Sequence, residues 1–232
     1  MSEAAAELRL SVQRVRQLIR SGSLPARRVS GRWVLDDADV SRLAAQNRPA
    51  HVRAFARPVA WGAAALSDGV VPEWLSTTQV SRLRRRLDDA GNDVGAWRAR
   101  MRARSLARHA LRVGRLQLPS LLLDDLTRTT GASSSNLVTD PLSDDGSATV
   151  WAAEDAAVDT LISRFGLLPS STGNLVVLIA GLPSAEDLGQ DGRNAYRLVV
   201  AVDLLDGTSA REHDAGEALL AAVLAETRWR DR

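Results

Sequence analysis

The sequence contains no cysteine and no lysine, and only 4% of its 232 residues are aromatic. Without cysteine the chain can form no disulfide bond, carries no thiolate nucleophile and offers no cysteine ligand to zinc. Its longest apolar runs, near residues 175–180 and 198–202, are far shorter than the roughly 20 residues of a membrane-spanning helix. We therefore expect a cytoplasmic protein with no signal peptide and no membrane partner.

The distribution of charge is uneven along the chain. All 30 basic residues are arginine, which indicates a coding bias more than a function. Residues 1–118 contain 22 arginines and 10 acidic residues, whereas residues 119–232 contain 8 arginines and 18 acidic residues. This asymmetry predicts two kinds of partner, nucleic-acid phosphates for the first half and a basic protein surface for the second.

The segment 10–35 predicts a helix followed by a β-hairpin. Ser11 is a suitable N-cap, and Gly22 with Pro25 predicts that the helix ends near Ser21. The apolar residues recur at helical spacing: Val12, Val15, Leu18 and Ile19. Two short β-type segments follow, residues 27–29 and 32–35, joined at Ser30-Gly31.

The flanking residues extend this pattern. Residues 3–8 predict a short alanine-rich helix and residues 9–11 a tight turn, while Asp36 or Asp37 can cap a third helix that carries Val40, Leu43 and Ala44. The segment AAELRLSVQRVRQLIRSGSLPARRVSGRWVLDDADV resembles the winged helix-turn-helix of excisionase-type and MerR-like DNA-binding proteins, over roughly residues 2–45. Arg9 departs from the pattern, because glycine is usual at that turn.

The helix and the hairpin supply candidate contacts to double-stranded DNA. Arginine can read guanine and glutamine can read adenine in the major groove, while arginines of the wing can bind phosphates or enter the minor groove. The candidate DNA-binding residues are Ser11, Gln13, Arg14, Arg16, Gln17 and Arg20 of the helix, and Arg27, Arg28 and Arg32 of the hairpin. The alternative is a merely solvated polar face.

The whole chain predicts an α+β protein. We expect a winged helix-turn-helix over residues 1–47, a linker over 48–58 and a second domain over 59–232, helical in 59–118 and mixed α/β in 119–232. Strands are expected at 149–152, 174–180 and 196–203, and helices at 76–87, 154–165 and from residue 211 or 212 onward. The arginines of 82–86 form either a second phosphate-binding strip or a solvated face. Some arginines of the stretch 97–111, which we expect to be helical, should contact acids of the C-terminal half.

A second resemblance covers most of the chain. It rests on the phrases ARPVAWGAAALSDG, VSRLRRRL, TGASSSN, VWAAEDAAVDTLISRFGL and VVAVDLLDGTSAREHDAGEALLAAVL. In this order behind an excisionase-like head, they resemble actinobacterial AbiEi-like antitoxins of the abortive-infection type. The resemblance implies a nucleotidyltransferase-like toxin as partner and repression of the protein's own operon through the winged domain.

Catalysis is not expected. A nucleotidyltransferase needs a Gly-Ser turn followed by two acids at Asp-x-Asp spacing, but Asp140, Asp144 and Asp145 after the turn at 131–135 lack that spacing. Asp203 and Asp206 follow an expected strand, where a capped turn at Asp206-Gly207 is favoured over a functional role. The three histidines are too scattered to form a ligand set. We expect no enzyme, no metal and no cofactor.

The leading hypothesis is therefore a sequence-specific transcriptional repressor that is also an antitoxin, with a possible homodimer presenting two wings to a repeated operator. The alternative is a plain winged-helix regulator whose C-terminal domain senses a ligand or dimerises. An excisionase-like architectural factor is third, because this chain has a large second domain that such a factor does not need.

Overall fold

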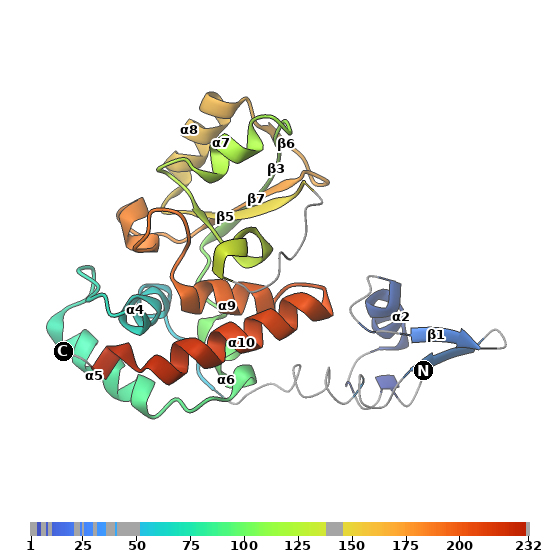
Figure 1. Cartoon of the computed structure of the whole chain (residues 1–232), viewed down its shortest axis with the longest axis horizontal. Coiled ribbons are helices and arrows are strands. Elements are labelled where there is room, and N and C mark those ends of the chain that lie inside the picture. The colour runs from blue at the N-terminus through green and yellow to red at the C-terminus, as the bar shows by residue number, and fades with distance from the viewer. Residues whose placement is uncertain are drawn as a thin grey trace.

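A computed structural model describes residues 4, 5, 8, 11–20, 24, 26–29, 32–35, 40, 52–137 and 146–230. Its helices are α2 (Val12–Arg20), α4 (Arg57–Ser67), α5 (Thr77–Asp88), α6 (Val94–Met101), α7 (Leu118–Leu122), α8 (Asp155–Phe165), α9 (Arg197–Leu205) and α10 (Ala210–Glu226) (Figure 1). Its strands are β1 (Ala26–Val29), β2 (Arg32–Leu35), β3 (Ala107–Arg112), β4 (Arg128–Thr129), β5 (Ala148–Ala152), β6 (Leu168–Pro169) and β7 (Leu175–Ile179). Within these ranges no helix is both long and apolar enough to cross a membrane.

The N-terminal part contains the expected helix and hairpin. Helix α2 is followed by β1 and β2, which pair antiparallel with Ala26 opposite Leu35 and Val29 opposite Arg32. A small core joins this part, formed by Ala4, Ala5, Leu8, Val15, Leu24 and Val40. The helix and both β segments are thus confirmed. Several residues used to predict this region lie outside the described ones: Arg9, Ser21, Gly22, Pro25, Ser30, Gly31, Asp36, Asp37, Leu43 and Ala44.

A five-stranded sheet, in the order β4-β5-β7-β3-β6, organises residues 107–179. Strand β5 runs parallel to β7, and the other neighbouring strands are antiparallel. Two parallel strands need a long crossover, which here contains α8. The strands expected at 149–152 and 174–180 are confirmed as β5 and β7.

Helices cover both faces of this sheet. Val150 and Val177 pack with Leu121 of α7 and Leu161 of α8 in one cluster on the first face. On the other face Trp151 meets Trp61 of α4 edge to face, with ring centroids 5.0 Å apart and ring planes at 87°. Figure 1 shows the sheet between α7 and α8 on one side and α9 on the other, with α10 running alongside α9. The sheet is therefore the middle layer of an α/β/α arrangement.

The expected strand over residues 196–203 is wrong, because this segment forms helix α9. All five residues from Leu198 to Val202 are fully buried, so the continuous apolar run fits a helix buried on every side as well as a central strand. Gly216 of α10 explains the close packing: a Cβ there would lie 2.9 Å from the Ala201 carbonyl oxygen. Packing against α10 therefore overrides the β preference of the valines.

The helix expected to continue through residue 111 is also wrong. Helix α6 ends at Met101, and β3 pairs with β7 across five residue pairs, from Ala107 opposite Ile179 to Leu111 opposite Leu175. Leu111 is buried while Arg108 and Arg112 are exposed, which is the alternation of a strand with one covered face. The expected linker also ends early, because Phe55 is buried in the core and α4 begins at Arg57. The division into separate domains stays a prediction.

Candidate nucleic-acid interface

Helix α2 is fixed at both ends by local hydrogen bonds. At its start, the Arg14 backbone N–H donates to the Ser11 hydroxyl oxygen at 3.2 Å, which is an N-cap bond. Beyond its end, the Leu24 backbone N–H donates to the Leu18 carbonyl oxygen at 3.1 Å, and Leu24 is buried. Ser11 therefore acts first as a cap, although it is also exposed and was predicted to contact DNA.

One face of α2 is buried and the other is exposed and polar. Val15 is fully buried, and Val12, Leu18 and Ile19 pack partly buried against the same core. The predicted DNA-facing residues Gln13, Arg14 and Arg16 are exposed. The first turn contains no acidic residue, so no carboxylate of that turn offsets the positive end of the helix dipole. This end of α2 is therefore suited to approach phosphates and base edges.

The hairpin adds an exposed tryptophan that the sequence analysis did not select. The register places Trp33 opposite Arg28 and Val34 opposite Arg27. Trp33 and Val34 remain 41% and 38% exposed, which is unusual for large apolar side chains. The sequence feature that could have identified it is a tryptophan within a short arginine-rich hairpin.

The structure does not describe every predicted contact residue. Its backbone includes all the candidates, but the side chains of Gln17, Arg20, Arg27, Arg28 and Arg32 lie outside the described part. Contacts to DNA from all nine candidate residues stay predictions.

Asp203, considered above as a possible functional acid, belongs to a buried network. It lies within α9 and not after a strand, and its carboxylate accepts hydrogen bonds from Trp151 Nε1 at 2.7 Å, from Arg104 Nε at 2.8 Å and from the Thr130 hydroxyl. Because these four residues come from α9, the sheet, the segment after α6 and the turn after β4, the network ties distant parts of the chain together. Its role is structural.

Asp206, at the end of α9, extends the network. It accepts hydrogen bonds from Arg104 Nη2 at 2.7 Å and from Arg98 Nη2 at 2.9 Å. Burial lowers the pKa of Arg104, but the charges of Asp203 and Asp206 outweigh it and raise that pKa above its usual value. The expectation that arginines of this stretch contact acids of the C-terminal half is confirmed.

The other groups considered for chemistry do not converge among the described residues. His109 Nε2 lies 2.9 Å from Asp155 Oδ1. Among the described residues, no three or more histidine or acidic side chains form a cluster suited to a metal ion. Four residues considered earlier lie outside the described ranges: His51, Asp140, Asp144 and Asp145. The expectation of no enzyme, metal or cofactor stays a prediction.

Comparison with known proteins identifies the N-terminal part of the chain. Residues 1–48 match the family described as "Helix-turn-helix domain". No curated protein and no solved structure matches the chain. The N-terminal part is thus a helix-turn-helix domain, which indicates DNA binding, and the remainder is mixed α/β.

Proposed function

We propose that this protein is a sequence-specific DNA-binding transcriptional repressor that inserts α2 into the major groove. The observation that carries the proposal is the two-sided character of α2. Val15 is fully buried in the small core, while Gln13, Arg14 and Arg16 are exposed near the capped start of the helix. The major groove, roughly 12 Å wide, admits one α-helix, and recognition helices contact bases mainly from their N-terminal part.

Each candidate residue then has a distinct role. Gln13, Arg14 and Gln17 lie in the first two turns of α2, where contact with base edges is expected. Arg20, the last residue of the helix, is better placed for a phosphate. The wing would bind the backbone through Arg27, Arg28 and Arg32, which sets position on the DNA without reading the sequence.

A binding-site selection experiment tests this assignment. Arg14→Ala or Gln17→Ala should cost on the order of 1 to 3 kcal/mol at the selected site and relax the preference at one base pair. Arg20→Ala is the matched control, since losing a phosphate contact should weaken binding to all sequences alike. If Arg14→Ala and Gln17→Ala both keep the parent's sequence preference, α2 does not read bases.

A finer form of the proposal makes the protein an antitoxin that represses its own operon and counters a nucleotidyltransferase-like toxin. Only the resemblance in sequence supports this form, because the family match covers residues 1–48 and names no antitoxin. Co-expression with a nucleotidyltransferase-like neighbour tests it. Absence of both a complex and a rescue of growth would remove the antitoxin role and favour a plain regulator whose C-terminal domain senses a ligand or dimerises.

A further inference from the structure

Four arginines gather where the chain enters the α/β part, and we call them the α5 arginine patch: Arg53, Arg82, Arg86 and Arg100. Arg53, Arg82 and Arg86 are exposed, and Arg100 is half-buried. Two of the four stack on aromatic rings: the Arg86 guanidinium lies 4.6 Å from the Phe55 ring centroid and the Arg100 guanidinium 5.3 Å from the Trp97 ring centroid. Stacking on a ring fixes an arginine and leaves its charge available.

Phe55 connects the members of the patch. Its backbone N–H donates to the Arg100 carbonyl oxygen at 2.8 Å, and Arg53 precedes it by two residues. Arg82 lies four residues before Arg86 on α5, so both are on one face of that helix. Burial and the charge of Arg86 lower the pKa of Arg100, so these two cations lie close enough to repel each other. The fold thus concentrates positive charge here.

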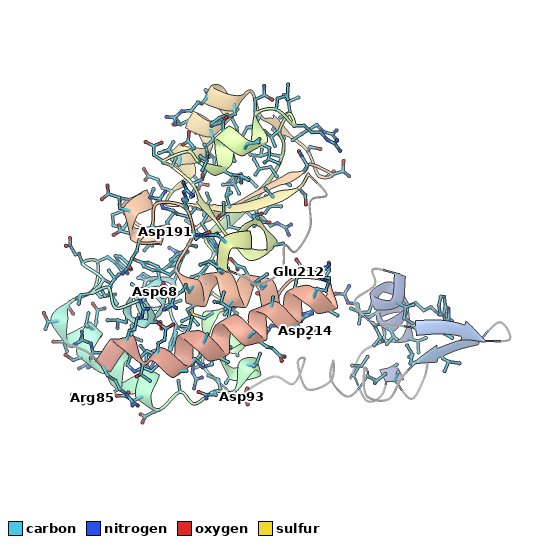
Figure 2. The ribbon with its side chains drawn as sticks, in the orientation of Figure 1. Asp68, Arg85, Asp93, Asp191, Glu212 and Asp214 are labelled. Carbon is cyan, nitrogen blue, oxygen red and sulfur yellow. The ribbon has the colours of Figure 1, made fainter. Side chains whose placement is uncertain are left out.

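The patch is not neutralised by the acidic residues of the described ranges. Arg53, Arg82 and Arg86 form no ion pair there, whereas Arg104, Arg164 and Arg197 each contact a carboxylate. Asp93 acts on Arg100 from a distance, while its own carboxylate caps α6 by accepting from the Ala96 N–H. Figure 2 shows Arg85, the neighbour of Arg86, at the outer edge of α5 and away from the sheet. Because Arg53, Arg82 and Arg86 are themselves exposed, an anionic partner can reach this face.

The first residue of the patch follows closely on the helix-turn-helix match. The helix-turn-helix match ends at residue 48, five residues before Arg53. Even a fully extended chain of that length spans only about 18 Å. Each DNA strand presents a phosphate every 3.4 Å or so along the axis, so phosphates continue on both sides of any site that the helix-turn-helix domain reads.

We propose that the α5 arginine patch binds the phosphate backbone of DNA beside the site that the helix-turn-helix domain reads. The inference rests on the proposed function and adds to it a second, sequence-independent contact from the α/β part. The partner is the DNA backbone, because the patch is cationic and its first member follows closely on a DNA-binding domain.

The salt dependence of binding tests the inference. The experiment uses a duplex of about 30 base pairs, roughly three helical turns. For the full-length Arg82→Gln/Arg86→Gln variant, the slope of log affinity against log salt should be less steep than that of the wild type by about 1.8, which is about 0.9 for each lost phosphate contact. Its affinity should accordingly fall about 12-fold less than that of the wild type between about 50 and 200 mM salt. Arg82→Gln alone, which disturbs no aromatic contact, should show half of the slope change.

The matched control is Arg108→Gln/Arg112→Gln. It removes the same charge from two exposed arginines of β3, which lies in the sheet and not beside α5 (Figure 1). The control should keep the wild-type slope. On a duplex of about 12 base pairs, close to one helical turn, the patch variant should match the wild type because flanking phosphates are missing.

The outcomes separate the two proposals. Failure of the wild type to bind any duplex overturns the proposed function. Normal wild-type binding with equal slopes for the patch variant and the control overturns only the patch contact. An equal loss on the short and the long duplex also overturns it, because the effect would then not come from flanking phosphates.

Discussion

Replacing Asp203 by alanine should destabilise the α/β part more than replacing Asp206 by alanine. The Asp203 side chain is 8% exposed and that of its partner Arg104 is 9% exposed, whereas the Asp206 side chain is 43% exposed. Asp203→Ala leaves a buried guanidinium with only Asp206 to balance it. It also removes the acceptor of Trp151 Nε1 and of the Thr130 hydroxyl.

The size of the effect follows from these contacts. Removing one partner of a buried ion pair costs about 3 to 5 kcal/mol, and each buried donor left without an acceptor costs about 1 to 3 kcal/mol. Because Asp206 still faces Arg104 and these terms overlap, we expect a loss of about 4 kcal/mol, a large part of the roughly 5 to 15 kcal/mol that stabilises a typical domain. At a slope near 2 kcal/mol per molar urea, the unfolding midpoint should fall by about 2 M.

Urea unfolding followed by far-UV circular dichroism measures this loss. Asp206→Ala is the control, and we expect it to cost no more than about 1 kcal/mol because its charge is partly solvated. Asp203→Asn should fall between the two, since an amide oxygen can still accept a hydrogen bond but carries no charge. If Asp203→Ala and Asp206→Ala lower the midpoint equally and only slightly, the network does not stabilise the fold as described.

Two further predictions concern the wing and the response to acid. Trp33 is 41% exposed and Trp74 is half-buried, while the other four tryptophans are buried. Adding DNA should therefore reduce acrylamide quenching of tryptophan fluorescence, and Trp33→Phe should remove most of that change; quenching unaffected by DNA would place the hairpin away from the duplex. Hydrogen bonds from Arg197 hold the pKa of Glu226 below its usual value, so its contribution to stability is present above the unfolded-state pKa of about 4.3 and is lost as the pH falls through the folded-state pKa. Urea midpoints measured across this acidic range should therefore decline less steeply for Glu226→Gln than for the wild type, and parallel declines would contradict the reasoning.

The N-terminal elements could be predicted because their signals are local. The Ser11 cap, the helical spacing around Val15 and the two β-type segments each depend on residues within a turn or two of one another. The same holds for α5 and α8, which were predicted from apolar residues at helical spacing. In the structure a capping box of Ser76 and Gln79 begins α5, and Gly166 in the left-handed conformation caps the end of α8. A local signal predicts structure reliably because the groups that form the contact are already neighbours in the chain and need no tertiary partner.

Part of the candidate interface needed the folded chain. The sequence selected Gln13, Arg14 and Arg16 correctly as exposed residues, since helical periodicity separates them from the buried stripe. The α5 arginine patch was only half visible in the sequence as arginines of one helix. The fold adds Arg53 and Arg100 by placing Phe55 against both Arg86 and the end of α6.

The tertiary structure alone decided the identity of α9 and β3. Residues 198–202 have the same continuous apolar character whether they form a central strand or a helix buried on all sides, and contact with α10 at Gly216 selects the helix. Residues 107–112 form a strand because β7, more than 60 residues later, supplies their hydrogen-bond partners. Asp203 likewise belongs to a buried network because α9 places its carboxylate beside Arg104. For β3 and Asp203 the deciding partner lies more than 60 residues away, and for α9 it lies in the following helix, so no pattern within the segment itself contains it.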